Sequence, residues 1–298
     1  MYQTIKKAFF IPFVFIVLST ACTAGENMNA NGKFVFTDGS STINAIDFSS
    51  SEFSTSTIFK SKEVGAINHL IRVDSNTILF GECPISRECV LRQYSIDVGK
   101  SEVLRTGRLP SYLPNHKRLF FYDKASDGSN WLYETALDNI TEVKKVAKEP
   151  SKKVLPNGVK QSVSVPVVQV SNNEIIYVGD DKQLWLYNII DKKRESTEIK
   201  NCRPILWREK HNQLLCSDWE TWTPFLLDLN TKRKVKISEL KEAYGFAYIK
   251  ESDTLIYGKT RLKAMVDETY DIFLYSFQNK EEKRIKKNTH LASGVWFK

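Results

Sequence analysis

Apolar and polar residues alternate along most of the chain after residue 32, and this pattern predicts β-strands. The apolar positions are rich in β-branched and aromatic residues, and turns of Gly, Asn, Asp and Lys interrupt them every few residues. No segment shows the periodicity of a long amphipathic helix. We therefore predict an all-β domain over residues 33–298, preceded by a short linker at residues 22–32.

One strand pattern recurs six times and divides this domain into repeats. Each copy is followed by a polar turn, and the copies lie at residues 45–48, 93–96, 132–135, 186–189, 226–229 and 274–277. Their mean spacing of about 46 residues fits the length of a four-stranded propeller blade. A similar strand precedes four of them, at residues 119–122, 175–178, 214–216 and 255–257. The pattern predicts a six-bladed β-propeller of four-stranded antiparallel blades, with seven blades as the alternative.

The two ends of the predicted domain complement each other. Residues 33–36 have the pattern of a second strand, and residues 293–297 have that of a first strand. Pairing them in one blade closes the ring and covers strand edges that would otherwise favour aggregation. We expect this closure to be essential for stability.

The segment at residues 110–119, Pro-Ser-Tyr-Leu-Pro-Asn-His-Lys-Arg-Leu, resembles the hairpin between the first and second strands of TolB-like six-bladed propellers. The resemblance extends to the wider class of WD-repeat-like propellers, although the repeats lack the Trp-Asp ending of WD repeats. It implies that the loops joining strands two to three and four to one gather at one mouth of a central channel. It also implies that this face binds another protein of the cell envelope.

The first 21 residues are typical of a secretory signal peptide. Lys6 and Lys7 precede an apolar run of about eleven residues, which is shorter than the roughly 20 residues that a membrane-spanning helix needs. Small residues at 19–21 follow this run. Removing the signal lowers the net charge from +8 to +6, which suits anionic surfaces of the envelope and also simple solubility.

Cys22 follows Ser19, Thr20 and Ala21 directly, and this arrangement resembles the lipobox of bacterial lipoproteins. Ser19 stands where that family usually has leucine. The resemblance implies a signal peptide of the lipoprotein type and acylation, including palmitate, at Cys22. The alternative is cleavage by ordinary signal peptidase, which releases a soluble protein.

Four further cysteines, Cys83, Cys89, Cys202 and Cys216, would then lie in an oxidising compartment. Proximity in the sequence favours pairing Cys83 with Cys89, and Cys202 with Cys216 across a hairpin. Buried free thiols are the alternative.

The predicted loops between second and third strands are acidic, and the turns between third and fourth strands are basic. The acidic set comprises Asp38, Glu82, Asp123, Asp127, Asp180, Asp181, Asp218 and Glu220, and the basic set comprises Lys100, Lys192, Lys193, Lys232 and Lys280. This predicts an acidic mouth and a basic underside. Chance differences between hydrophilic turns are the alternative.

The segment from Asp218 to Thr223 places Trp219 and Trp222 beside Glu220, directly after a predicted strand. Exposed tryptophans suit sugar stacking or a protein-binding hot spot, whereas buried ones would fill the core or cap the channel. Two insertions, at residues 148–161 and 259–269, are further candidate binding loops, and the second contains Arg261 and Lys263.

The sequence contains no motif for a nucleophile elbow, a metal-binding helix, a phosphate loop or a paired-cysteine metal site. Its four histidines fall in different repeats. An active site built from His69, Arg72 and Asp218 at the channel mouth would need proximity that sequence spacing does not predict. We therefore expect no catalytic residues, no metal and no cofactor, and favour a non-enzymatic protein while leaving enzymatic activity open.

These observations lead to one principal hypothesis for function. The chain would be an exported scaffold or adaptor, lipid-anchored on the periplasmic side of a Gram-negative outer membrane, that binds another envelope protein and not nucleic acid. A carbohydrate-binding or carbohydrate-processing propeller is the main alternative, and a purely structural anchor is a third.

Overall fold

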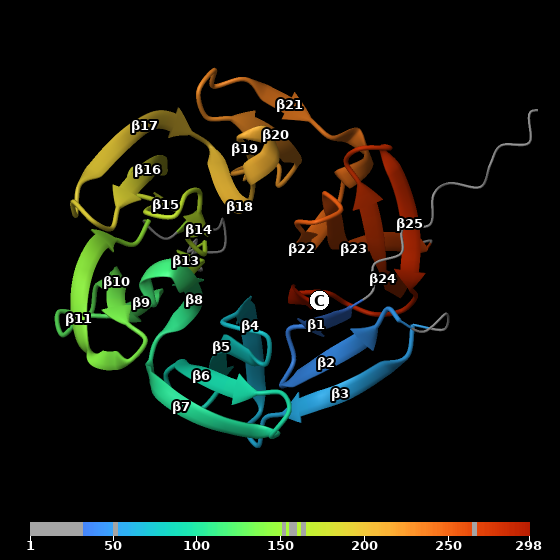
Figure 1. Cartoon of the computed structure of the whole chain (residues 1–298), viewed down its shortest axis with the longest axis horizontal. Coiled ribbons are helices and arrows are strands. Elements are labelled where there is room, and N and C mark those ends of the chain that lie inside the picture. The colour runs from blue at the N-terminus through green and yellow to red at the C-terminus, as the bar shows by residue number, and fades with distance from the viewer. Residues whose placement is uncertain (1–31, 50–52, 151–152, 155–159, 162–164, 264–266) are drawn as a thin grey trace, which may run out of the picture. The chain divides into compact units, whose positions relative to one another are not determined.

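The computed structural model describes residues 32–49, 53–150, 153–154, 160–161, 165–263 and 267–298. Within these ranges six four-stranded antiparallel sheets stand around a central axis as the blades of a propeller (Figure 1). In each blade the first strand lies nearest the axis and the fourth lies at the rim. The predicted six-bladed, all-β architecture is therefore confirmed.

The first three blades are built from consecutive strands, except where the two ends of the domain meet. Blade 1 contains β26 (Ser293–Phe297), β1 (Lys33–Thr37), β2 (Thr42–Asp47) and β3 (Thr55–Lys60). Blade 2 contains β4 (Gly65–Arg72), β5 (Thr77–Pro84), β6 (Val90–Ser95) and β7 (Lys100–Thr106). Blade 3 contains β8 (Arg108–Leu113), β9 (Arg118–Lys124), β10 (Asn130–Ala136) and β11 (Asn139–Lys148).

The other three blades continue the same order. Blade 4 contains β14 (Val168–Gln169), β15 (Glu174–Val178), β16 (Gln183–Asn188) and β17 (Arg194–Lys200). Blade 5 contains β18 (Cys202–Arg208), β19 (Gln213–Asp218), β20 (Pro224–Asp228) and β21 (Lys234–Lys236). Blade 6 contains β22 (Ala243–Ile249), β23 (Thr254–Lys263), β24 (Asp267–Ser276) and β25 (Glu281–Lys286).

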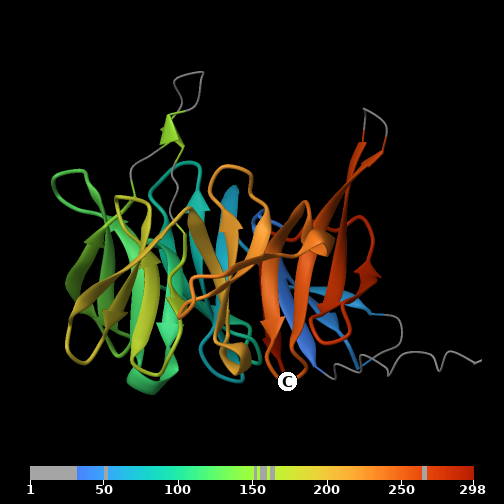
Figure 2. The ribbon, with the colours of Figure 1, turned by 90° about the horizontal axis from the view of Figure 1, so that it is seen from above.

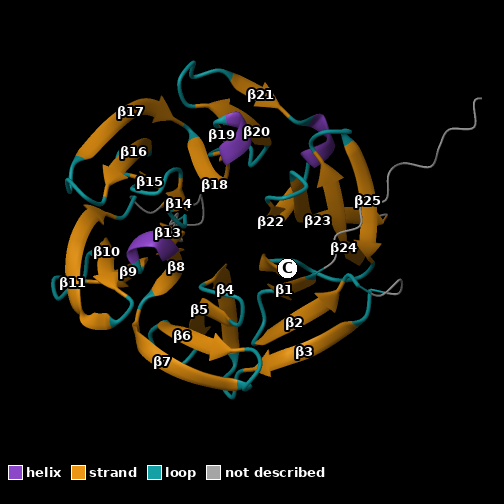
Figure 3. Cartoon of the chain, in the orientation of Figure 1, coloured by secondary structure: helices purple, strands orange, loops and turns teal. Residues whose placement is uncertain are grey.

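Short helical turns supplement the strands of the described chain (Figure 3). They are the 3-10 turns η1 (Pro114–His116), η2 (Glu209–His211) and η3 (Ser238–Leu240). The first two connect first and second strands, where His116 is half-buried and His211 is exposed. No helix in the described part of the chain is long and apolar enough to span a membrane.

The second strands are buried on both faces because each blade packs against a neighbour on either side. This explains why runs such as residues 34–36, 119–122 and 255–257 are apolar without interruption. One core cluster joins blades 4 and 5 through Ile176, Val178, Leu214 and Leu227. Similar clusters join blades 1 and 2, blades 2 and 3, blades 3 and 4, and blades 5 and 6.

The ring closes as the end patterns predict. In blade 1, β26 pairs with β1 from Thr37 opposite Ser293 to Lys33 opposite Phe297. Figure 1 shows the C-terminal strand beside β1, on the axis side of the blade. A hydrogen bond from the Leu70 backbone N–H to Ser293 Oγ, 2.9 Å long, also ties this strand to blade 2.

Both predicted disulfides are present. Cys202 and Cys216 are completely buried in the core between blades 4 and 5, whereas Cys83 and Cys89 are half-buried at the loop between β5 and β6. Thiol–disulfide exchange requires access of the attacking thiolate to a sulfur atom. Burial should therefore protect the bond between Cys202 and Cys216 while the protein stays folded.

We expect mild reductant to open the bond between Cys83 and Cys89 first in the native protein. Alkylation followed by peptide mass spectrometry would report modification at residues 83 and 89 while residues 202 and 216 remain protected. In denaturant both pairs should be modified together. Equal modification of the two pairs under native conditions would contradict this account of their environments.

The structure corrects the description of the two insertions as loops. In the second, β23 and β24 extend as one continuous hairpin in which Arg261 pairs with Thr269 and Lys263 with Asp267 (Figure 2). In the first, β12 (Lys153–Val154) pairs with β13 (Lys160–Gln161). Strand pairing replaces loop structure because backbone hydrogen bonds continue between the two arms of each hairpin.

Candidate functional site

The channel opens on one face into a cavity of about 940 Å³. Loops between second and third strands and connections between fourth and first strands form this face, the mouth of the channel. The walls are largely apolar and include Val165, Pro204, Ile205, Ala243 and Phe246. The cavity is therefore suited to a ligand that carries apolar groups.

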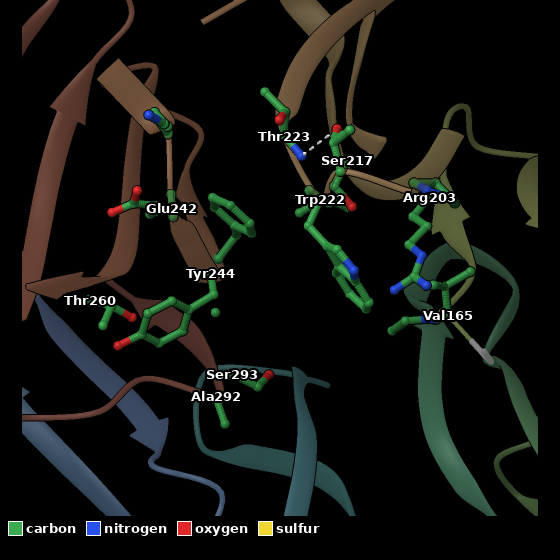
Figure 4. A pocket seen from close by; sticks show the side chains of 18 of the residues that line it. Val165, Arg203, Ser217, Trp222, Thr223, Glu242, Tyr244, Thr260, Ala292 and Ser293 are labelled. Carbon is green, nitrogen blue, oxygen red and sulfur yellow. Dashed lines mark hydrogen bonds between the residues drawn. The ribbon is translucent and has the colours of Figure 1, made fainter. Parts of the chain in front are cut away.

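Arg203, on the first strand of blade 5, lines this cavity. Its guanidinium carbon lies 4.4 Å from the ring centre of Trp219 and 3.5 Å from that of Trp222. The arginine is 6% exposed and burial lowers its pKa to about 10, so it remains charged at neutral pH. Figure 4 shows Trp222 and Arg203 together, with Glu242 and Tyr244 across the cavity.

The loop that carries Trp222 is shaped by the side chain of Asp218. Asp218 Oδ1 accepts hydrogen bonds from the backbone N–H groups of Glu220 and Thr221 and from the Thr221 hydroxyl. These bonds to the carboxylate help to lower the pKa of Asp218. The turn leaves Trp222 with φ at +59° and 55% exposed, which is uncommon for a large residue.

The structure separates the residues that were predicted to contact a partner. Trp222 is exposed at the mouth as expected, and Glu220 is exposed on the same turn. Trp219 is 2% exposed within the core, so the alternative of a buried tryptophan holds for it and its assignment as a partner-binding residue is wrong. Asp218 is engaged by its own turn. The side chains of Arg261 and Lys263 lie outside the described residues.

Arg203 was not among the predicted site residues, although one signal points to it. The predicted disulfide between Cys202 and Cys216 makes β18 and β19 neighbours, and in the observed register Arg203 stands opposite Ser217. Two residues further along β19 and its turn lies Trp219. The pairing of these cysteines thus brings the two strands together, and the observed register sets the arginine beside the tryptophans.

The prediction of an acidic mouth is not supported in detail. Glu82 and Asp123 lie within strands β5 and β9, and Glu82 is buried in an ion pair of 2.8 Å with Arg92. Asp38, Asp127, Asp181 and Asp218 all accept hydrogen bonds from their own loops. These carboxylates stabilise turns, and the described charged residues that line the cavity are Arg203, Lys241 and Glu242.

His69 lies on β4 and lines both this cavity and a second one, of about 350 Å³, towards the opposite mouth. Its backbone φ is +43°. Removal from bulk water lowers the pKa of His69 to about 4. The imidazole is therefore neutral at physiological pH.

The depressed pKa of His69 should make stability depend on pH. The unfolded chain, with an ordinary histidine pKa near 6.5, takes up a proton before the folded chain does. This contribution to stability is therefore complete above pH 6.5 and is lost as the pH falls towards 4. Between pH 7 and pH 5 we expect a loss of about 2 kcal/mol in the free energy of unfolding, measured by denaturant titration.

His69→Asn should remove this component, since asparagine tolerates positive φ and does not titrate. The free energy of unfolding is measured against pH for the unchanged protein and for the variant, and the two slopes are compared. Parallel slopes between pH 7 and pH 5 would rule out the titration of His69 as their cause.

The described residues do not bring together the three side chains considered for catalysis. Arg72 donates to the carbonyl groups of Asp74 and Trp296 and stacks on Phe297, whereas Asp218 caps its own turn. In the described ranges no group of three or more His, Cys, Asp or Glu side chains is placed to hold a metal ion. What the mouth offers is a stacked cation, an exposed aromatic ring and apolar walls.

Solved structures with this architecture include TolB from Acinetobacter baumannii, at a TM-score of 0.68 and 12% identity, covering 90% of this chain and 67% of that one. A protein assigned as TolB from Agrobacterium tumefaciens matches at 0.55 and 11%, covering 88% and 92% respectively. The chain has the TolB-like six-bladed propeller fold. A protein of unknown function from Bacteroides thetaiotaomicron matches at 0.53 and 10%, covering 89% and 81%.

The similarity to TolB-like propellers is one of structure, because no family model and no curated protein matches the sequence. At identities of 10% to 12% these similarities show the fold of this TolB-like propeller. Side chains at its mouth therefore have to be interpreted from their own chemistry.

Proposed function

We propose that this TolB-like propeller is an exported, lipid-anchored scaffold that binds another protein of the cell envelope at the mouth defined above. The observation that carries the proposal is Trp222, an exposed ring at the rim of an apolar-walled cavity. Rigid aromatic side chains beside pockets are typical hot spots of protein interfaces. The cavity is concave and preformed, as binding sites generally are.

The location of the protein is part of the proposal. Two disulfides are consistent with an oxidising compartment such as the periplasm. The signal peptide at residues 1–21 and the acylation site at Cys22 lie outside the described residues. Mass spectrometry of the N-terminal peptide tests them: acyl chains on Cys22 are expected, and an unmodified cysteine would remove the lipid anchor from the account.

Partner binding can be tested by photo-crosslinking in cells with a photoreactive residue at position 241. Lys241 is exposed, lines the cavity and precedes Glu242, which lies across the cavity from Trp222 (Figure 4), so replacing it leaves the stacked tryptophans intact. The matched control is Lys193, an exposed residue in the turn between β16 and β17 on the opposite face. A discrete protein adduct from position 241 alone is expected. No adduct there, or the same adducts from both positions, would refute a partner-binding mouth.

Carbohydrate binding remains the second candidate because the exposed ring of Trp222 also suits stacking against a sugar. Apolar walls favour the protein partner, since a sugar needs many polar groups around it. Titration with neutral and acidic oligosaccharides, followed by tryptophan fluorescence, distinguishes the two. Saturable binding of an oligosaccharide combined with no protein adduct would favour this second candidate.

A further inference from the structure

Two arginines are deeply buried in the described part of the chain, and Arg203 differs from the other in having no acidic partner there. Arg208, which is 5% exposed, forms two hydrogen bonds with the Asp253 carboxylate, at 3.0 and 2.5 Å. Among the described residues no carboxylate forms an ion pair with Arg203, and its Nε is buried without a hydrogen-bond acceptor. Burying a charge without a partner is costly, so this arrangement requires an explanation.

The two tryptophans offset part of the cost of burying the Arg203 charge, but they leave the hydrogen-bonding capacity of the arginine unused. Ring faces of Trp219 and Trp222 attract the guanidinium through cation–π interaction. Its N–H donors lie in the plane of the group and form a fork that matches the two oxygens of a carboxylate. Stacking therefore stabilises the cation and leaves in-plane donors available at the wall of the cavity.

The surroundings of Arg203 favour an anion attached to apolar groups. Val165, Pro204 and Ile205 contribute apolar wall, and Glu242, which Lys241 precedes in the chain, lies across the cavity (Figure 4). Those two charges offset each other, which leaves the buried arginine as the unbalanced charge of the cavity. A carboxylate would be attracted by this charge, and neighbouring aliphatic side chains would bury area against the walls.

We propose that the mouth binds an acidic peptide segment of the partner, with one carboxylate held by Arg203 beneath Trp222. This inference rests on the proposed function and specifies its chemistry. The carboxylate belongs to an aspartate, a glutamate or a chain terminus flanked by apolar residues. Apolar walls favour such a peptide over an acidic sugar, whose hydroxyl groups would lose hydrogen bonds with water.

The inference can be tested with the full-length protein and two matched probes, acetyl-Ala-Leu-Glu-Leu-Ala-amide and the same peptide with Gln in place of Glu. Binding is measured by calorimetry and by tryptophan fluorescence, which reports on Trp222. The glutamate peptide should bind at least tenfold more tightly, since hydrogen-bonded charge pairs are considerably stronger than neutral ones. Such a contact predicts a dissociation constant of roughly 10 mM at the weakest. Equal affinities of the two peptides would overturn the proposal, and so would no binding of the glutamate peptide at that concentration.

Arg203→Met should abolish the discrimination between the two peptides while retaining the length of the side chain. The matched control is Arg105→Met, because Arg105 also stacks on an aromatic ring, Phe121 at 4.6 Å, but lies outside the cavity. The control should preserve the ratio of affinities. If Arg203→Met fails to fold, Arg203→Lys keeps the charge and should reduce the ratio by removing the fork. An unchanged ratio in a folded Arg203 variant would overturn the proposal.

A third probe, trigalacturonate, separates the peptide from an acidic glycan. Tighter binding of trigalacturonate than of the glutamate peptide would overturn the peptide assignment. The crosslinking test does not depend on the result of the peptide test. A protein adduct from position 241 would support the partner-binding mouth even if Arg203 does not select a carboxylate. The two proposals can therefore fail separately.

Discussion

Deletion of residues 293–298 should abolish cooperative folding. This segment supplies β26, which pairs with β1 and buries Trp296 and Phe297. Burial of a large apolar side chain stabilises a protein by about 1.5–3 kcal/mol, and two such residues plus a lost strand approach the total stability of a typical domain, about 5–15 kcal/mol. The deletion also exposes the edge of β1 to intermolecular pairing. Circular dichroism during heating should show no sharp transition, or one displaced far below that of the full chain.

Removal of Lys298 alone is the matched control. This residue is exposed and follows the last strand residue, so its loss should leave the thermal transition unchanged. A cooperative transition of the six-residue deletion at the temperature of the intact protein would show that the ring does not depend on its closing strand.

Asp253→Ala should lower the free energy of unfolding by about 3–5 kcal/mol, because it leaves the buried charge of Arg208 without an acidic partner. Asp253 also accepts a hydrogen bond of 2.6 Å from the Tyr248 hydroxyl. The pair joins blade 5 to blade 6, so its loss weakens a contact between blades. Denaturant titration at pH 7 measures the change.

The control for this prediction is Glu63→Ala. Glu63 pairs with Arg87 at 2.6 Å, but both side chains are well exposed, and such surface pairs contribute about 0–1 kcal/mol. A further comparison is Arg208→Met combined with Asp253→Leu, which removes both charges and should recover part of the stability. Similar effects of Asp253→Ala and Glu63→Ala would contradict the importance assigned to burial.

The blade count and ring closure could be predicted because they depend on local pattern and spacing. Each third strand carries its own copy of the repeat, and the strands at 33–37 and 293–297 show complementary patterns at the two ends. The disulfides could be predicted for a similar reason, since each joins residues close in the sequence, separated by 6 and 14 positions. Short-range information was sufficient for these features.

The mouth was less accessible to prediction because side-chain direction decides its chemistry. Trp219 and Trp222 are three positions apart on the same turn, yet one is buried and the other is exposed. Composition indicated an acidic face, but a carboxylate such as Asp218 is engaged in shaping its turn. Arg203 is unpaired because no carboxylate of the described residues reaches it. Which carboxylates come near it is decided only when all six blades are assembled.

The most direct test of the account is the yield of the protein adduct from a photoreactive residue at position 241 in cells, compared between three backgrounds: unchanged Arg203, Arg203→Met and Arg105→Met. Protein level and thermal stability are matched before the yields are compared. The account predicts a discrete adduct that persists in the Arg105 variant and is lost in the Arg203 variant. An adduct that is equally strong in all three backgrounds, or absent from all of them, would contradict the claim that the mouth holds an acidic partner through Arg203.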